Sequence, residues 1–175
     1  MNEMRKRLSF LSAAVLISCV IASSCSRQYE YDAASGNVLL SVCIEDSATK
    51  SATKVAGQSE NAESTIRNIQ VFVFNKTTGQ VDNATYKDGL NSAGSYTLDP
   101  LQCTVGEREI WAIVNAPADY TGTITALDAL KATSVALSDN GISSLVMVGS
   151  SSKVLAAGTD AITLPVSRLC AAVVL

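Results

Sequence analysis

The 175-residue chain contains five cysteines and no histidine. The lack of imidazole excludes Ser-His-Asp and Cys-His nucleophilic catalysis and histidine-ligated zinc. Glu107 and Glu109 alternate along an apolar run and would face the same way on a strand. Exposed strand carboxylates of this kind are far commoner than acid–base pairs. We therefore predict that the protein is not an enzyme and holds no metal or cofactor.

Three of the five cysteines lie in the body of the chain. Cys43, Cys103 and Cys170 are far apart, form no CxxC pair, and each sits in an apolar, strand-like run. A free thiol in such a run behaves as a small buried hydrophobic group. Their spacing predicts neither a metal-ligand cluster nor a disulfide framework.

The other two cysteines, Cys19 and Cys25, lie in a segment with the layout of an export signal. A cationic patch at residues 5–7 precedes an uncharged apolar run at residues 8–22, shorter than the about 20 residues that span a bilayer. Small residues before a cysteine resemble a lipoprotein signal-peptidase site, where the thiol is acylated and becomes the new N-terminus. Cys25 is favoured because polar sequence follows it directly, and Cys19 is the alternative. An ordinary signal peptide cut elsewhere, or a non-cleaved anchor, would also fit this layout.

Composition indicates a globular remainder. Apolar residues make up 47% of the chain and charged residues 17%, which is enough apolar material for a core. The 13 basic and 16 acidic residues give a net charge of −3, which argues against nucleic acid as a partner. At roughly 150 residues per domain, the length predicts one domain plus a short extra segment.

The body shows the pattern of short strands. Val38, Leu40, Val42 and Ile44 share one side of an alternating run, and a polar segment at residues 45–64 follows as an expected exposed loop. We expect a helix at residues 125–132, capped by Thr125, with Leu127 and Leu130 on its apolar side. Residues 75–80 read as a turn, and polar, glycine-containing sequence continues to Tyr96. Further strands are predicted at residues 66–74, 95–98, 101–105, 108–115, 145–148, 161–166 and 168–175. The pattern predicts an all-β, mainly antiparallel sandwich or partly open barrel of about seven strands.

Taken in order, these pieces resemble the N-terminal domain of the fimbrillin family, the type V pilins of Gram-negative anaerobes. The resemblance covers essentially the whole chain and lies in the signal, the strand at residues 37–44 with its basic loop, and the runs at residues 66–75, 106–116, 145–149 and 164–172. It implies a transthyretin-like pilin β-sandwich. It also implies three segments: a lipoprotein signal peptide at residues 1–24, a propeptide with an exchangeable first strand at residues 25–54, and the β domain at residues 55–175.

The resemblance further implies how such a chain is used. The precursor reaches the outer membrane as a lipoprotein, and a trypsin-like protease cuts the loop after the first strand. Removal of that strand leaves a groove that a strand of a neighbouring fimbrial subunit fills, and the assembled surface fimbrium serves adhesion. The family is cut at arginine, whereas this loop offers Lys50 and Lys54. A second, C-terminal β domain is usual in the family. The sequence stops at Leu175 within an apolar run, so we expect this domain to be absent from it, either because the sequence is a fragment or because the gene is truncated.

Three alternatives stay open at this stage. The run containing Val38, Leu40, Val42 and Ile44 could be a plain structural strand of a stable monomer. The chain could be an accessory or anchor subunit that keeps its lipid. It could also be a lipid-anchored surface module that binds glycans or host protein as a monomer.

Overall fold

The computed structural model describes residues 36–47, 65–133 and 145–169, all within one compact unit that spans residues 31–175. The lipidation candidates Cys19 and Cys25, the cleavage candidates Lys50 and Lys54, and Cys170 lie outside the described residues. The described part holds ten strands and one helix, α2 (Leu127–Ala132). The strands are β1 (Asn37–Asp46), β2 (Thr65–Ile66), β3 (Ile69–Asn75), β4 (Val81–Lys87), β5 (Ser92–Ala93), β6 (Ser95–Thr97), β7 (Leu101–Thr104), β8 (Gly106–Val114), β9 (Met147–Leu155) and β10 (Gly158–Arg168).

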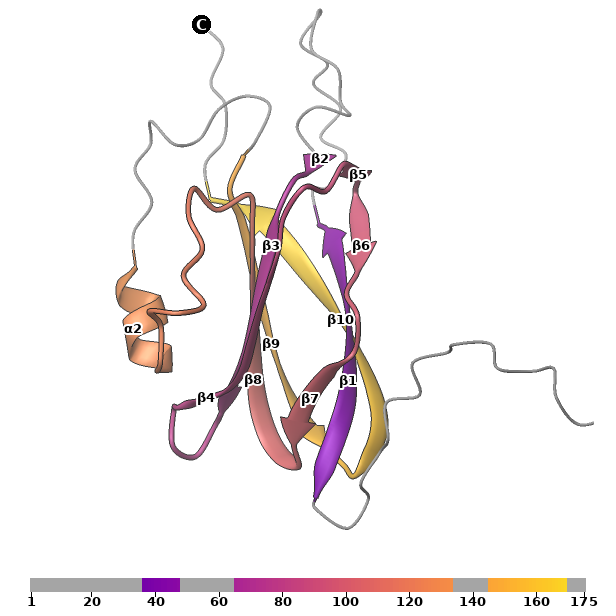
Figure 1. The fold of residues 1–175 in the computed structure, drawn as a ribbon, viewed down its shortest axis with the longest axis vertical. Coiled ribbons are helices and arrows are strands. Elements are labelled where there is room, and N and C mark those ends of the chain that lie inside the picture. The colour runs from indigo at the N-terminus through magenta and orange to yellow at the C-terminus, as the bar shows by residue number, and fades with distance from the viewer. Residues whose placement is uncertain (1–35, 48–64, 134–144, 170–175) are drawn as a thin grey trace, which may run out of the picture. The chain divides into compact units, whose positions relative to one another are not determined.

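Eight of these strands form one sheet that folds over its own core (Figure 1). The order is β4-β3-β8-β9-β10-β1-β6, and β7 pairs with β1 beside β6; β2 and β5 form a separate two-stranded sheet. All ladders are antiparallel except the one between β1 and β10, which is parallel. The prediction of an all-β, mainly antiparallel fold is therefore confirmed, with ten described strands in place of about seven.

The main core lies between the two halves of this folded sheet. Strands β3, β8 and β9 contribute one wall, and β1, β7 and β10 contribute the opposite wall. The buried residues of the cluster include Val71, Val73, Ile110, Ala112, Met147, Leu101, Cys103, Leu164, Val166 and the inward side of β1. Because side chains alternate along a strand, each wall turns only every second residue toward this core.

A second, smaller cluster covers the outer face of β3, β8 and the segment before β9. Phe72 and Phe74 stack there with ring centroids 6.0 Å apart, and Leu130 of α2 packs over this face. The buried amide of Gln70 fixes the covering loop, since it donates to the carbonyl of Ala118 and accepts from the N–H of Tyr120. Strand β3 is buried on both faces, which explains its apolar run from Val71 to Phe74.

Strand β4 lies in the polar, glycine-containing sequence before Tyr96, where no strand was predicted. All seven residues of β4 are half-buried, and the strand pairs with β3 from Ile69↔Lys87 to Phe74↔Val81. Strand β4 lies at the edge of the sheet and neither of its faces is fully buried. Its sequence therefore does not need to alternate between apolar and polar residues, and it shows no such alternation.

The expected cap of the helix was also wrong. The N-cap residue of α2 is Ala126, which makes no side-chain capping bond. The N–H of Leu127 instead donates to the carbonyl of Gly79, and the carbonyl of Thr125 accepts from the N–H of Val81. The turn between β3 and β4 thus supplies an acceptor for the helix start, which removes the need for a capping hydroxyl.

Two predicted strands proved longer than expected. The strand predicted at residues 145–148 is β9, which runs to Leu155, and the strand predicted at residues 161–166 is β10, which begins at Gly158. Arg168 ends β10 and does not begin a new strand. Serine, glycine and alanine between the apolar residues hide both extensions in the sequence.

Candidate functional site

Strand β1 lies in the interior of the sheet, bonded along both of its edges (Figure 1). One edge pairs in parallel with β10 over nine positions, from Val38↔Gly158 to Asp46↔Val166. The other edge pairs with β7 at its start and with β6 at its end, both antiparallel. We call the space that β1 fills between β10 and the β6–β7 segment the β1 site.

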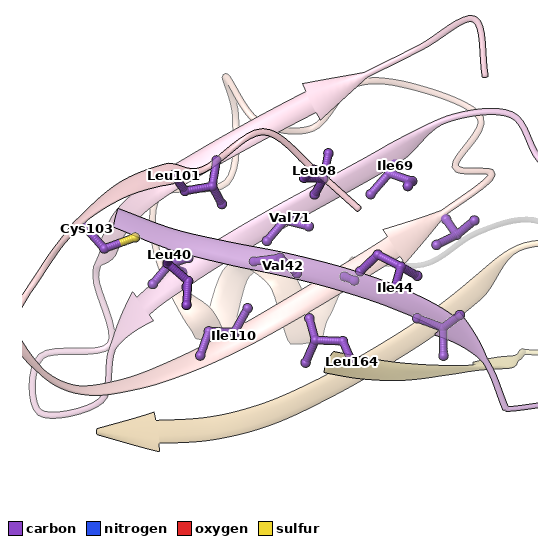
Figure 2. Packing of buried hydrophobic residues seen from close by; sticks show 14 of the residues in the cluster. Leu40, Val42, Ile44, Ile69, Val71, Leu98, Leu101, Cys103, Ile110 and Leu164 are labelled. Atoms are coloured by element: carbon purple, nitrogen blue, oxygen red, sulfur yellow. The ribbon is translucent and has the colours of Figure 1, made fainter. Parts of the chain in front are cut away.

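The inward face of β1 forms part of the main core. Val38, Leu40, Val42 and Ile44 each have 0% of their surface exposed, so the predicted alternation is confirmed. Figure 2 shows Leu40, Val42 and Ile44 among Val71 and Ile110 of the facing strands, with Leu164 of the neighbouring strand β10 close by. Burial of each such side chain is worth about 1.5–3 kcal/mol, so β1 is among the strands on which the core depends.

The outward face of β1 is less covered. Leu39, Ser41 and Cys43 are half-buried and Glu45 is exposed. The strand ends at Asp46, whose carboxylate lies 3.4 Å from the Arg168 guanidinium. In a strand that is buried on one face and partly exposed to solvent on the other, every second residue must be apolar. The residues between them can be polar or apolar.

Without β1, the β1 site would be an apolar slot between unpaired backbones. Leu98, Leu101 and Leu164 would lose a covering strand, and the edges of β10, β6 and β7 would lose their ladders. Such edges pair readily with an extended segment from another chain, because backbone hydrogen bonds supply affinity and alternate side-chain pockets supply register.

Cys103 lines this slot opposite Val38, so the reactivity of its thiol can be used to detect whether β1 occupies the site. Its side chain is buried in the main core. Burial, together with the nearby negative charge of Asp82, raises the pKa of the Cys103 thiol from its usual 9.0 to about 12. At mildly alkaline pH the thiolate, which is the reactive form, is therefore about a thousandfold scarcer than for a free cysteine.

We predict that removal of β1 increases alkylation of Cys103 by at least a hundredfold, since it both exposes the thiol and restores its pKa. Iodoacetamide treatment at pH 8 followed by peptide mass mapping measures this for each cysteine. Cys43, half-buried on the outward face of β1, is the internal reference in the intact chain. Equal labelling of Cys103 and Cys43 in the intact chain would contradict this assignment.

Strand β10, the parallel wall of the β1 site, has few backbone bonds on its other edge. It pairs with β9 only at Ser167↔Val148 and Arg168↔Met147. Farther along, Lys153 of β9 bridges the two strands, since its ammonium bonds to the carboxylate of Asp160 and the carbonyl of Ala161. The hydrogen bond from Lys153, with another from the N–H of Ala161, lowers the pKa of Asp160 below its usual 3.8.

The lowered pKa of Asp160 gives a pH-dependent contribution to stability. The charged carboxylate stabilises the fold above pH 3.8, and this contribution is lost as the pH falls through the lowered pKa. We expect Asp160→Asn to reduce the free energy of unfolding at pH 7 by about 1 kcal/mol or less, since the pair is partly exposed. Urea unfolding of both chains from pH 7 to pH 3 should show the difference shrinking toward acid. A difference that grows toward acid would contradict the assignment.

The two carboxylates considered in the sequence analysis, Glu107 and Glu109, both interact with neighbouring side chains. Glu107 forms an ion pair with Lys76, and Glu109 accepts a hydrogen bond from the Trp111 indole and lies 3.7 Å from the Lys131 ammonium. In residues 36–47, 65–133 and 145–169, no three acidic, cysteine or histidine side chains gather in a way that could hold a metal ion. No helix of that same part of the chain is long and apolar enough to cross a membrane.

Comparison with known proteins places this fold among proteins of cell-surface filaments. The family profile described as "Major fimbrial subunit protein (FimA)" matches residues 37–164. A comparison of the sequence with curated proteins found no match.

Solved structures share the fold at low identity. A proposed cell adhesion protein from Parabacteroides distasonis superposes with a TM-score of 0.60 at 21% identity, over 71% of this chain and 39% of that chain. The tip fimbrial protein Mfa3 from Porphyromonas gingivalis, with a C-terminal truncation, gives 0.59 at 14% identity, over 76% and 48%. A fimbrilin from Porphyromonas gingivalis gives 0.55 at 16% identity, over 75% and 40%. The chain thus spans less than half the length of these structures.

Proposed function

The chain belongs to the family of the major fimbrial subunit protein, and on this premise we propose that it is a subunit of a cell-surface fimbrium assembled by exchange of β1. In this proposal, β1 is a placeholder that occupies the β1 site until a strand of a neighbouring subunit replaces it. The filament so formed would serve adhesion. The observation that carries the proposal is the place of β1, an interior strand whose four inward side chains are completely buried.

Two features make β1 a segment that proteolysis could release. It is the first described strand, and in the sequence the segment that follows it carries Lys50 and Lys54, both targets for a trypsin-like protease. A cut after either lysine leaves β1 attached to the domain only through its noncovalent contacts. The cut therefore converts an intramolecular strand into one that competes with strands from other chains.

Export would precede this step. We propose that the chain is delivered to the outer membrane as a lipoprotein acylated at Cys25, with Cys19 as the alternative, and that it reaches the cell surface in this form. The polar sequence after Cys25 supports the choice. Removal of residues 25–54 with β1 would then detach the subunit from its lipid.

Trypsin treatment of the purified precursor tests the proposal. Mass spectrometry should find a new N-terminus at Ser51 or Val55, and SDS-resistant ladders should appear. The matched control is Lys50→Gln/Lys54→Gln, which should give neither that cut nor ladders. An intact or cut wild-type chain that stays monomeric would overturn strand exchange and favour a lipid-anchored accessory subunit or a monomeric glycan- or protein-binding module.

A further inference from the structure

The wall of the β1 site formed by β6 and β7 depends on β1 for its backbone bonding. We call residues 95–104, which contain both strands, the outer ribbon. Among the described strands, β7 has no ladder partner except β1, and the main sheet ends at β6. The N–H of Leu98, between them, also donates to β1, at the carbonyl of Val42. Departure of β1 would therefore remove the ladder bonds that hold the outer ribbon in the main sheet.

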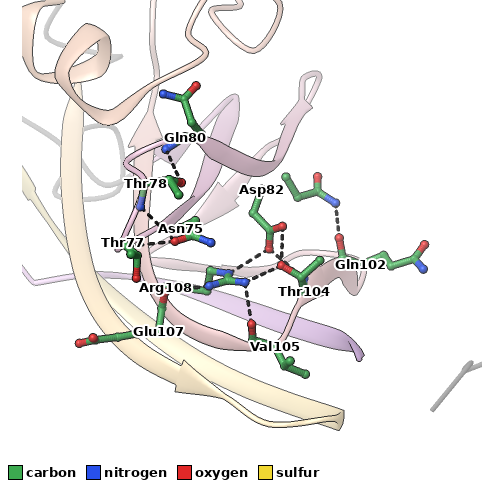
Figure 3. Close-up of polar contacts among 11 residues, drawn as sticks. Asn75, Thr77, Thr78, Gln80, Asp82, Gln102, Thr104, Val105, Glu107 and Arg108 are labelled. Carbon is green, nitrogen blue, oxygen red and sulfur yellow. Dashed lines mark hydrogen bonds and ion pairs between the residues drawn. The ribbon is translucent and has the colours of Figure 1, made fainter. Parts of the chain in front are cut away.

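A polar cluster nevertheless ties β7 to the opposite half of the sandwich (Figure 3). Asp82 of β4 accepts two hydrogen bonds from Thr104 of β7, each 2.8 Å long, one from the backbone N–H and one from the hydroxyl. Arg108 of β8 donates from Nε to the same carboxylate over 3.1 Å. None of these bonds involves β1.

The guanidinium of Arg108 donates three further hydrogen bonds in this cluster. Its Nη2 donates to the Val105 carbonyl over 2.7 Å and also to the Thr104 hydroxyl, and its Nη1 donates to the Glu107 carbonyl. Arg108 has 4% of its side chain exposed and Asp82 has 12%. A buried ion pair that makes several further hydrogen bonds in this way fixes the position of the groups it contacts.

A break in the β3–β4 ladder places Asp82 where it can reach β7. The register passes from Val73↔Asn83 to Phe74↔Val81, so Asp82 has no partner on β3. A bulge of this kind turns a side chain away from its regular direction. The next residue, Asn83, donates to the Gln102 carbonyl over 2.6 Å. Strand β4 thus holds β7 through side chains, with no backbone ladder between them.

From this geometry we propose that Asp82, Thr104 and Arg108 form a clamp that holds β7 in position while the β1 site is empty. The inference rests on the proposed strand exchange. With the clamp in place, the site keeps β10 on one side and β7 on the other, so an incoming strand meets a preformed edge at β7. Without it, β7 must be ordered again each time a strand binds, which slows capture. Asp82 and Arg108 are therefore positioning residues that act through β7.

Uptake of a β1 peptide tests the clamp. The full chain is cut with trypsin and incubated with excess fluorescein-labelled peptide of residues 36–47 carrying Cys43→Ser, and uptake is followed by fluorescence anisotropy and native mass spectrometry. Wild type should take up one peptide per chain. Asp82→Ala/Arg108→Met, which leaves neither charge buried alone, should take it up about tenfold more slowly. Thr104→Val, which keeps the ion pair and is the variant to use if the double variant does not fold, should be about threefold slower.

Controls separate a positioning role from general stability. Lys76→Met removes the exposed ion pair between Lys76, in the turn after β3, and Glu107 of β8, while the Glu107 carbonyl that accepts from Arg108 is unchanged, so this variant should behave as wild type. Hydrogen exchange of the Leu101 and Cys103 amides should stay slow in every uncut chain and become fast in the clamp variants only after cutting.

Two results would overturn the clamp. One is peptide uptake at the wild-type rate by both clamp variants, and the other is equal loss of protection in their uncut and cut forms. Failure of the cut wild-type chain to take up any peptide is a distinct outcome, which would overturn strand exchange and the clamp together.

Discussion

Leu40→Ala is expected to lower the free energy of unfolding by about 2–5 kcal/mol, because it leaves a cavity in the main core where Leu40 is completely buried. Leu39→Ala, at the half-buried position just before it, is the matched control and should cost about 1 kcal/mol or less. Urea unfolding followed by the fluorescence of Trp111, the only tryptophan, measures both.

The same pair of variants connects stability with assembly. In a peptide of residues 36–47, Leu40→Ala should weaken uptake by the cut chain, whereas Leu39→Ala should leave it near wild type. A cost at Leu39 equal to or larger than that at Leu40 would show that the face assigned to the core is wrong. The account of the β1 site would then lose its physical basis.

Gly149→Ala is expected to destabilise the fold by about 3 kcal/mol or more. A Cβ atom at Gly149 of β9 would lie 2.2 Å from the carbonyl oxygen of Pro165 on β10. The obstacle is backbone, so the two strands must separate where β10 leaves β9 and turns toward β1. Thermal unfolding of the variant measures the cost, and loss of protection should concentrate in β10.

Gly122→Ala is the matched control for this substitution. Nothing lies within 4 Å of a Cβ built at Gly122, and its backbone is not in the left-handed region. The variant should be neutral or more stable by up to about 1 kcal/mol, since alanine restricts the unfolded chain. Similar destabilisation by both substitutions would argue against the close crossing of β9 and β10.

Much of the fold can be predicted from the local sequence pattern. For the β1 site, the pattern predicts which face of β1 is buried but not which strands pair with it. The alternation of Val38, Leu40, Val42 and Ile44 predicts a strand with one buried face, because a period of two appears only when one face is covered. The pairing of β1 with β10 joins residues more than a hundred positions apart, and nothing in either segment specifies a parallel partner. The periodicity of a segment indicates which of its faces is buried, but it does not indicate which other strand pairs with that segment.

The clamp was missed for a different reason. Asp82 lies in a polar stretch that reads as loop, and its importance comes from a bulge and from Thr104 and Arg108 on two other strands. Only Arg108 gave a signal, since it occupies an inward position of β8 in phase with Ile110 and Ala112. A charged residue on the apolar side of a strand indicates a buried partner, although it does not identify that partner.

A reversible lock on β1 tests the central claim most directly. Val38 and Cys103 are opposite each other across β1 and β7, so Val38→Cys should form a disulfide with Cys103 that ties β1 to the domain after trypsin has cut the chain. The account predicts no SDS-resistant ladders from the oxidised, cut variant and normal ladders once dithiothreitol is added. Val38→Cys/Cys103→Ser, which cannot lock, should form ladders with or without dithiothreitol. Ladders of equal yield from the locked and unlocked chains would contradict assembly by replacement of β1.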